Sequence, residues 1–331
     1  MRLASLLPPR PERLTDLRLV RHQGPMLKTL ARTAALAVGQ KLGRRADNDL
    51  PGPEIVQTVP PRDPELVARY LEHLGADPSS WGTSVPNHFF PQWTFPALAR
   101  TLERIPYPLG DLLNGGATMR SRSPVPMGES LTTRARLVRI DDDGRRAIMH
   151  QALTTGTPSA PDALEVEFRA IVRLRSRPPS GRDGGRDSGR EPGRDGGERA
   201  GREKPTVPDG AREIGRWALT PSSGLEFALL TGDFNPIHWV PVAAQAAGFK
   251  NTILHGFASM ARAAEALQRE LGHPQALAAL DVRFVQPLVL PRFAGDKKGV
   301  DTIGCYVRDQ EVFVGTTTGG PAFMVGTFAG R

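Results

Sequence analysis

The sequence predicts an α+β fold in which one architectural plan is used twice. The chain has 331 residues, enough for two ordinary domains or one large one. Each half contains one principal stretch of helical periodicity, and several β-like runs follow it. A sheet of such strands buries one face on the helix, which is the layer arrangement of an α+β protein.

The principal helices are expected where two short segments echo each other. FPALAR at 95–100 opens a helical stretch that runs to residue 105, and FASMAR at 257–262 opens one that runs to residue 271. Phe, Ala and Arg match at an offset of 162, and Pro124 and Pro287 farther along match at an offset of 163. An internal repeat of this kind indicates duplication.

Each half then ends in predicted strands that turn signals separate. The runs are 131–140, 145–155 and 165–174 in the first half, and 301–309, 311–319 and 322–330 in the second. Asp143-Gly144 and Gly319-Gly320-Pro321 mark turns between strands.

Composition divides the chain into a basic N-terminal extension (1–53), a first unit (54–177), a linker (178–205) and a second unit (206–331). The linker has no aliphatic residue larger than alanine, and its seven basic and six acidic residues nearly cancel. We therefore expect a disordered, mixed-charge spacer. Within the extension, 26–45 has the periodicity of a basic amphipathic helix. Such a helix can lie on a membrane, but more often it packs on its own domain.

The charge balance raises the question of a nucleic-acid partner. The formal net charge is +8 and the pI is near 10.2. However, nine of the lysines and arginines lie between Arg10 and Arg45, and no arginine cluster is interleaved with aromatic residues. We expect no nucleic-acid partner. A solvated basic face and attraction for an anionic small molecule, such as a phosphorylated cofactor, fit the charge equally well.

Cysteine usage and hydropathy indicate a cytoplasmic protein. Cys305 is the single cysteine, which excludes an internal disulfide and favours a reducing compartment. No window approaches the roughly 20 consecutive apolar residues of a membrane span. Prolines interrupt the short apolar run at the start, which is unlike a secretory signal. We expect no stable membrane insertion.

The stretch LLTGDFNPIHWV at 229–240 is the strongest candidate for a site. A helix is predicted before it, with Thr220 as N-cap, Gly232 at its end and Pro236 preventing its continuation. Asp233 and His238 then lie five residues apart in a loop, where a bent backbone can bring both side chains to one cavity. A surface turn accounts for the glycine, aspartate and proline, but it does not account for His238.

A second signal lies in AGFKNTILHGFASMARA, where the second principal helix starts near His255 and Gly256. Gly256 has no side chain to block a ligand. Its N–H lies at a helix N-terminus, which favours developing negative charge. We expect His255 to hydrogen-bond to backbone and to position this helix.

TGDFNPIH, followed by AGFKNTILHG and a helix, closely resembles the signature of the MaoC-like, or (R)-specific enoyl-CoA hydratase, family of hot-dog proteins. The resemblance covers about Trp217 to Pro291. It implies a double hot-dog, in which a long central helix wrapped by an antiparallel sheet occurs twice. Residues 54–177 resemble a degenerate first half that lacks the motif. Such a chain is a pseudo-dimer, and further pairing into a homodimer stays open.

The resemblance also implies roles for the site residues. Asp233 and His238 would hold and activate water, and Asn235 would shape the loop. The Gly256 N–H would bind the thioester oxygen as it becomes enolate-like, and Asn235, His255 and Gly256 would form the substrate side of the site. The implied reaction interconverts trans-2-enoyl and (R)-3-hydroxyacyl thioesters of coenzyme A or acyl carrier protein, with no cofactor and no metal.

This chemistry agrees with the residue types. Hydration needs a base for the water, a proton for C2 and stabilisation of the oxyanion; a carboxylate, an imidazole and a helix N-terminus meet these needs. The division of acid and base between Asp233 and His238 stays open. A non-catalytic acyl-binding subunit and a thioesterase are the alternative functions. In the first half, His88 lies near the equivalent place without an aspartate partner, so we expect a structural role for it.

Overall fold

The computed structural model describes residues 14–24, 26–29, 32, 49–109, 112–174 and 204–331. The predicted linker and the predicted helix at 26–45 lie largely outside these residues, and so does most of the N-terminal extension.

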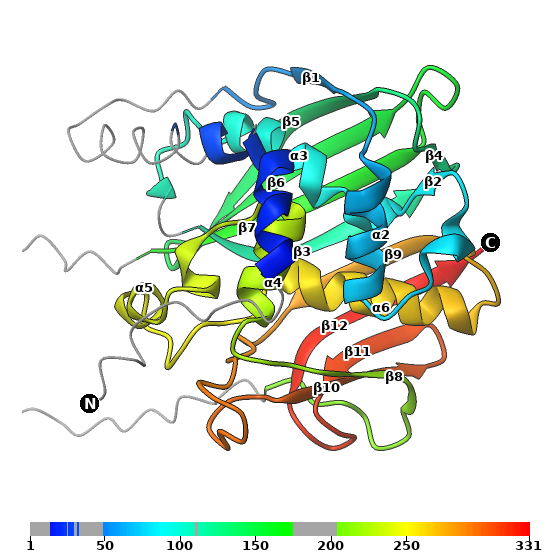
Figure 1. Cartoon of the computed structure of the whole chain (residues 1–331). Helices are drawn as coiled ribbons and strands as arrows, with labels where there is room; N and C mark the ends of the chain where they lie inside the picture. The colour runs from blue at the N-terminus through cyan, green and yellow to red at the C-terminus, as the bar shows by residue number, and fades with distance from the viewer. Residues whose placement is uncertain (1–13, 25, 30–31, 33–48, 110–111, 175–203) are drawn as a thin grey trace, which may run out of the picture.

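One antiparallel sheet of ten strands runs through the described part of the chain, in the order β1-β5-β6-β7-β3-β9-β12-β11-β10-β8 (Figure 1). The first half contributes β1 (Ile55–Val59), β3 (Leu112–Ser121), β5 (Leu131–Asp142), β6 (Arg146–Gly156) and β7 (Leu164–Arg173). The second half contributes β8 (Arg212–Ala218), β9 (Leu277–Phe284), β10 (Thr302–Arg308), β11 (Glu311–Gly315) and β12 (Ala322–Gly330). Two short strands, β2 (Ser84–Val85) and β4 (Val125–Pro126), pair separately.

The sheet repeats one topology. In each half the first long strand lies at the outer edge, the second lies at the centre, and the last three fill the space between them. The outward order is therefore β3-β7-β6-β5-β1 on one side and β9-β12-β11-β10-β8 on the other. The strands predicted at the end of each half are confirmed, and the shared order agrees with the predicted duplication.

The central pair of strands joins the two halves. Thr118 of β3 lies opposite Asp281 of β9, and its hydroxyl donates to the Asp281 Oδ1 at 2.6 Å. The guanidinium of Arg169, on β7, donates to the same oxygen at 2.6 Å and to the Val282 carbonyl at 2.9 Å. Bonds to a charged acceptor are about twice as strong as neutral ones. Backbone pairing and a charge-assisted contact therefore both hold this seam.

The helices lie on one face of the curved sheet (Figure 1). The α-helices are α2 (Pro64–His73), α3 (Pro91–Thr101), α4 (Ser223–Thr231), α5 (Pro241–Ala246) and α6 (Gly256–Glu270). Short 3₁₀ helices are η2 (Leu14–Gln23), η3 (Pro78–Trp81), η4 (Asn87–Phe89) and η6 (Pro236–His238). Among the described residues, none of the helices is both long and apolar enough to span a bilayer.

Helix α6 is the predicted second principal helix and begins at the expected residue. Its buried face is rich in alanine, which favours the helix and lets the surrounding strands approach closely (Ala258, Ala261, Ala263, Ala264 and Ala266). The predicted start of the first helix at Phe95 is wrong, because α3 begins at Pro91. Proline fits the first helical position. Pro96 lies inside α3 and conceals the helical character of the residues before it.

Candidate active site

Helix α4 leads into the motif loop. The predicted N-cap, Thr220, is wrong: the helix begins at Ser223 with Ser222 as N-cap, and the Thr220 carbonyl accepts the Ser223 N–H at 3.2 Å. The predicted end is confirmed. Gly232 has φ 82°, and its N–H donates to the Ala228 carbonyl at 2.8 Å. A left-handed residue of this kind is what glycine supplies at a helix C-terminus.

Side chains of the loop hold its backbone in a bend. The Asn235 N–H donates to Asp233 Oδ1 at 3.4 Å, and the Ile237 N–H donates to Asn235 Oδ1 at 3.3 Å. Asn235 thus caps η6, and Pro236 occupies its first position. This bend returns His238 toward the side of the loop where Asp233 lies.

His238 is buried and its ring is fixed by a backbone carbonyl. Its side-chain Nδ1 lies 2.8 Å from the carbonyl oxygen of Ile253, which belongs to the second signal segment. A carbonyl only accepts, so Nδ1 carries the proton and Nε2 is the acceptor nitrogen of the neutral ring. The hydrogen bond therefore selects the tautomer as well as the ring orientation.

His255 connects the loop to the start of α6. Its Nε2 donates to the Asp233 carbonyl at 2.9 Å, and its ring stacks on His238 with centroids 3.6 Å apart. Phe227 of α4 packs against it, with ring centroids 5.0 Å apart. The Nδ1 atom of His255 is buried and has no hydrogen-bond partner in the described part of the chain. The bond to backbone is the positioning contact expected for this histidine.

Gly256 is the first residue of α6 and is half-buried, although the residues on both sides of it are buried. The first N–H groups of a helix have no intrahelical acceptor, so they are free to bind a ligand oxygen. The structure gives a further reason for glycine at this position. A Cβ there would lie 2.6 Å from the ring of Phe284, so the glycine makes room for that aromatic ring.

Burial sets the protonation of the three titratable groups. It raises the pKa of the Asp233 carboxyl above its ordinary 3.8, against the opposing attraction of His238. It lowers the pKa of His238 below 6.5, and it lowers the pKa of His255 much further. Both imidazoles are therefore neutral near pH 7, and the carboxylate is poised to take a proton more readily than an exposed aspartate.

The same three residues form a group with the spacing of metal ligands, which the sequence did not predict. One candidate ligand atom from each of Asp233, His238 and His255 lies within 4.8 Å of the others. One ring nitrogen of each histidine donates to a carbonyl, which leaves Nε2 of His238 and Nδ1 of His255 as the nitrogens with a free lone pair. Such a cluster can form hydrogen bonds with one small molecule such as water, and the carbonyl contacts are also compatible with metal coordination.

Two residues near the site were missed in the sequence. Gln23 of η2 is buried and donates through Nε2 to the carbonyls of Leu229 and Leu230, both at 3.0 Å, at the C-terminal end of α4. Gly224 of α4 lies against the backbone of His238, and a Cβ there would be 1.9 Å from the His238 carbonyl oxygen. Both contacts join segments that come close only in the folded structure, so no local sequence pattern predicts them.

His88 has a structural environment, as expected. Its Nε2 lies 2.7 Å from Glu265 Oε1, and its Nδ1 lies 2.9 Å from the Tyr70 hydroxyl. Trp81 donates to the same Glu265 oxygen at 3.1 Å. All four side chains are buried. Glu265 comes from α6, so this polar cluster ties the first half to the central helix of the second.

Comparison with known proteins finds a family match for the segment that contains this site. Residues 205–295 match the family model described as "MaoC like domain". The chain is 26% identical over 271 residues to the protein named 3-hydroxyacyl-thioester dehydratase X of Mycobacterium tuberculosis. That alignment covers 81% of this chain and 87% of the relative.

Solved structures support the same fold. The crystal structure of HtdX of Mycobacterium tuberculosis matches 84% of this chain and 100% of its own, with a TM-score of 0.61 and 18% identity. A second Mycobacterium tuberculosis protein, described as having a double hotdog fold, matches 86% of this chain and 97% of its own, with a TM-score of 0.50 and 13% identity. The predicted fold class is confirmed: the chain is a double hot-dog, and its two halves form a pseudo-dimer.

Proposed function

We propose that the chain is a hydro-lyase acting on acyl thioesters, because residues 205–295 match the family model described as "MaoC like domain". It interconverts trans-2-enoyl and (R)-3-hydroxyacyl thioesters, as the motif resemblance implies. The name of the Mycobacterium tuberculosis relative, a 3-hydroxyacyl-thioester dehydratase, supports the general reaction. A stereospecific (R) product and the catalytic roles below belong to the proposal.

One observation carries the proposal. Asp233 and His238 meet beside the N-terminus of α6, which starts at Gly256, and His255 joins the two parts through the Asp233 carbonyl. An acid–base pair and an anion-stabilising helix end thus share one site. Hydration of an enoyl thioester needs both.

The proposed reaction adds the hydroxide part of water to C3 and its proton to C2. His238 Nε2 is a proton acceptor near pH 7, because burial lowers the pKa of the imidazole, and the Asp233 carboxyl is a second acceptor in its ionised form. One acceptor takes the proton from water and delivers it to C2, while the other fixes the water. The Gly256 N–H stabilises the negative charge on the thioester oxygen in the enolate-like state. Dehydration follows the same path in reverse.

The test is the loss of enoyl-thioester absorbance when the protein meets trans-2-enoyl-CoA of short and medium chain length, with chiral analysis of the product. We expect (R)-3-hydroxyacyl product from the wild type. Asp233→Asn and His238→Ala should each lower kcat by roughly 10²–10⁴-fold, the usual contribution of a positioned acid–base group. Asp162→Asn and His273→Ala change exposed residues away from the site and serve as matched controls.

The alternative functions give different results in the same assay. A thioesterase would release a free thiol, which a thiol reagent detects, and the acyl product would be a carboxylic acid. An acyl-binding subunit would bind the thioester and leave it intact. Either result in the wild type, with coenzyme A and acyl carrier protein thioesters both tested, would refute the proposed hydration.

A further inference from the structure

A buried arginine lies on helix α6, outside the Asp233–His238 cluster. Arg262 is 3% exposed and follows His255 by seven residues, which is about two helical turns on the same face of α6. Its Nη1 donates to the Ala258 carbonyl at 3.1 Å, so the side chain extends back toward the start of the helix. Its buried Nε has no hydrogen-bond partner in the described part of the chain. Burial of such a cation is costly unless neighbouring groups compensate for its charge.

The other end of the guanidinium contacts the first half of the chain. Nη2 of Arg262 lies 3.1 Å from Nε2 of His73, at the end of α2. A guanidinium only donates, so His73 Nε2 accepts and the ring proton is on Nδ1. Burial and the charge of Arg262 lower the pKa of His73 to about 3, in agreement with a neutral acceptor. Nδ1 of His73 faces Glu226 Oε2 of α4 at 4.0 Å, and the three residues therefore form a bridge from α6 through α2 to α4.

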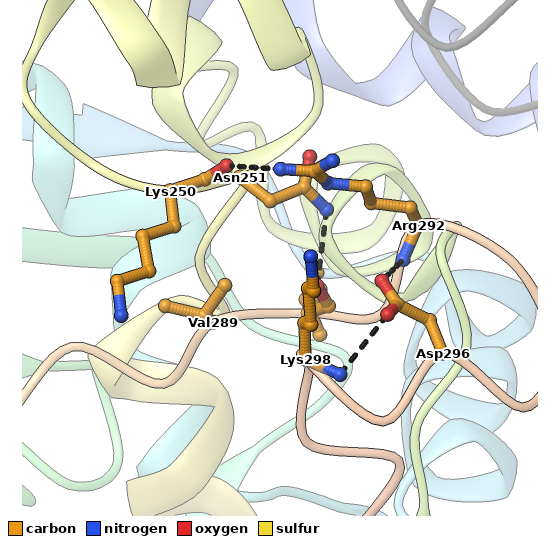
Figure 2. A pocket seen from close by; sticks show the side chains of 7 residues that line it. Lys250, Asn251, Val289, Arg292, Asp296 and Lys298 are labelled. Atoms are coloured by element: carbon orange, nitrogen blue, oxygen red, sulfur yellow. Dashed lines mark hydrogen bonds between the residues drawn. The ribbon is translucent and has the colours of Figure 1, made fainter.

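Arg262 differs in its surroundings from Arg292, which lines a surface cavity (Figure 2). The Arg292 side chain is exposed and donates through Nη2 to the Lys250 carbonyl at 3.1 Å. Water around an exposed arginine screens its charge, so its ionic contacts contribute little. Burial lowers the pKa of Arg262 to about 10, and the Glu226 carboxylate opposes this shift. Arg262 is therefore charged at pH 7 without solvent to screen it, and its contacts with protein groups are the strong ones.

Phe227 connects this bridge to the candidate active site. It follows Glu226 on α4 and is buried, and its ring centroid lies 6.3 Å from that of His73 and 5.0 Å from that of His255. His255 in turn donates to the Asp233 carbonyl at 2.9 Å. A movement of α4 against α6 would shift Phe227 against His255 and would displace the loop that follows α4. The place of the Asp233 carboxylate therefore depends on how these two helices are held together.

We propose that Arg262 and His73 are positioning residues for the hydration reaction, because their hydrogen bond and the facing Glu226 carboxylate fix α4 against α6. In this role neither residue contacts the reacting atoms, and each acts through the helices that lead to them. The first half then supplies a side chain on which the site in the second half depends. This inference rests on the proposed function and adds to it two residues that lie outside the sequence motif.

A conservative and a disruptive variant of His73 test the proposal in the enoyl-thioester assay. His73→Gln keeps an acceptor for Arg262 near the place of Nε2, and His73→Leu removes it. We expect His73→Leu to lower kcat roughly 10²-fold with KM unchanged, since a misplacement of about 1 Å has a cost of this order, and His73→Gln to retain most of the wild-type kcat. Arg262→Met should behave as His73→Leu does. Arg269→Met is the matched control, because Arg269 is an exposed arginine on the same helix.

The double variant measures the coupling between the two residues. If they act through one hydrogen bond, Arg262→Met combined with His73→Leu should lower kcat no further than either change alone. Fully additive losses would show that the two residues act separately and would overturn the inference. If Arg262→Met does not fold, the comparison of the two His73 variants decides: a wild-type kcat in His73→Leu, or an equal loss in His73→Gln, would overturn it.

Nitrogen-15 NMR of the imidazoles gives a readout independent of turnover. In the wild type at pH 6, His73 should be neutral with its proton on Nδ1, and in Arg262→Met its pKa should rise because the neighbouring cation is gone. A His73 ring that carries its proton on Nε2, or on both nitrogens, at pH 6 would overturn the inference. A wild type that has the expected His73 tautomer and hydrates no enoyl thioester would support the bridge and refute the proposed function.

Discussion

Gly224→Ala should have opposite effects on helix α4 and on the candidate active site beside it. In an exposed helix interior, replacing glycine by alanine stabilises by about 1 kcal/mol. At Gly224, however, the new Cβ would lie 1.9 Å from the carbonyl oxygen of His238 and 2.9 Å from its carbonyl carbon. We therefore expect a substitution that favours the helix to destabilise the protein.

The geometry gives the size of the effect. A Cβ contact shorter than 3.0 Å is essentially never seen, so the His238 carbonyl must move by about 3.0 − 1.9 ≈ 1.1 Å. Overpacking of this kind costs about 1–3 kcal/mol, and the helix gain offsets at most about 1 kcal/mol of it. With the full offset, a net loss of up to about 2 kcal/mol follows. Because His238 itself moves by about 1 Å, kcat should fall by roughly 10² as well.

Chemical denaturation and the enoyl-thioester assay measure the two effects on the same sample. Gly210→Ala is the matched control, because a Cβ at Gly210 would meet nothing within 4 Å. It should leave stability and rate near the wild-type values. A Gly224→Ala protein as stable and as active as the wild type would show that α4 does not fix the position of His238.

Three further outcomes follow from burial and hydrogen bonding. The hydration rate should fall on the acid side at a pH above 3.8, because burial raises the pKa of Asp233; an acid limb at or below 3.8 in the pH–rate profile would contradict this. The free energy of unfolding should fall as pH drops from 6.5 toward 3, by up to about 1.4 kcal/mol per pH unit from His73 alone. Burial lowers the pKa of His73 to about 3, so the stabilising effect of its neutral form is present above pH 6.5 and is lost as the unfolded chain takes up the proton. Urea titrations at pH 7 and pH 5 measure this change in the free energy of unfolding, and His73→Gln should make that free energy depend less on pH. Gln23→Ala should destabilise by about 1–3 kcal/mol, because the carbonyls of Leu229 and Leu230 lose their donor, and an unchanged denaturation midpoint would refute this role.

Local signals in the sequence were sufficient for much of the fold. The strand predicted at 131–140 is β5, which has buried and exposed residues in alternation over most of its length. Gly232 and Pro236 act through their own backbone preferences, so the end of α4 and the start of η6 could be predicted from residue type. The start of α6 at Gly256 follows from the same kind of information.

Contacts between distant segments could not be predicted in this way. Gln23 caps carbonyls 206 and 207 residues away, and the buried partner of His88 lies 177 residues away on α6. Neither pair has a periodicity or a turn that would reveal it. Gly224 is close to His238 in the sequence, but its importance depends on how tightly α4 approaches the loop. In each case the contact depends on tertiary packing, which the local sequence does not specify.

The strand pairing between β3 and β9 bears on what either half would be if it were separated. Within the intact sheet both strands have neighbours on two sides, so the outer strands β1 and β8 are its free edges. Cutting the molecule into halves would turn each central strand into a long open edge with unsatisfied backbone donors and acceptors, and such edges recruit other chains. The half that contains Asp233 and His238 is therefore expected to stay soluble only when a partner strand covers this edge, and in the intact chain β3 of the first half covers it.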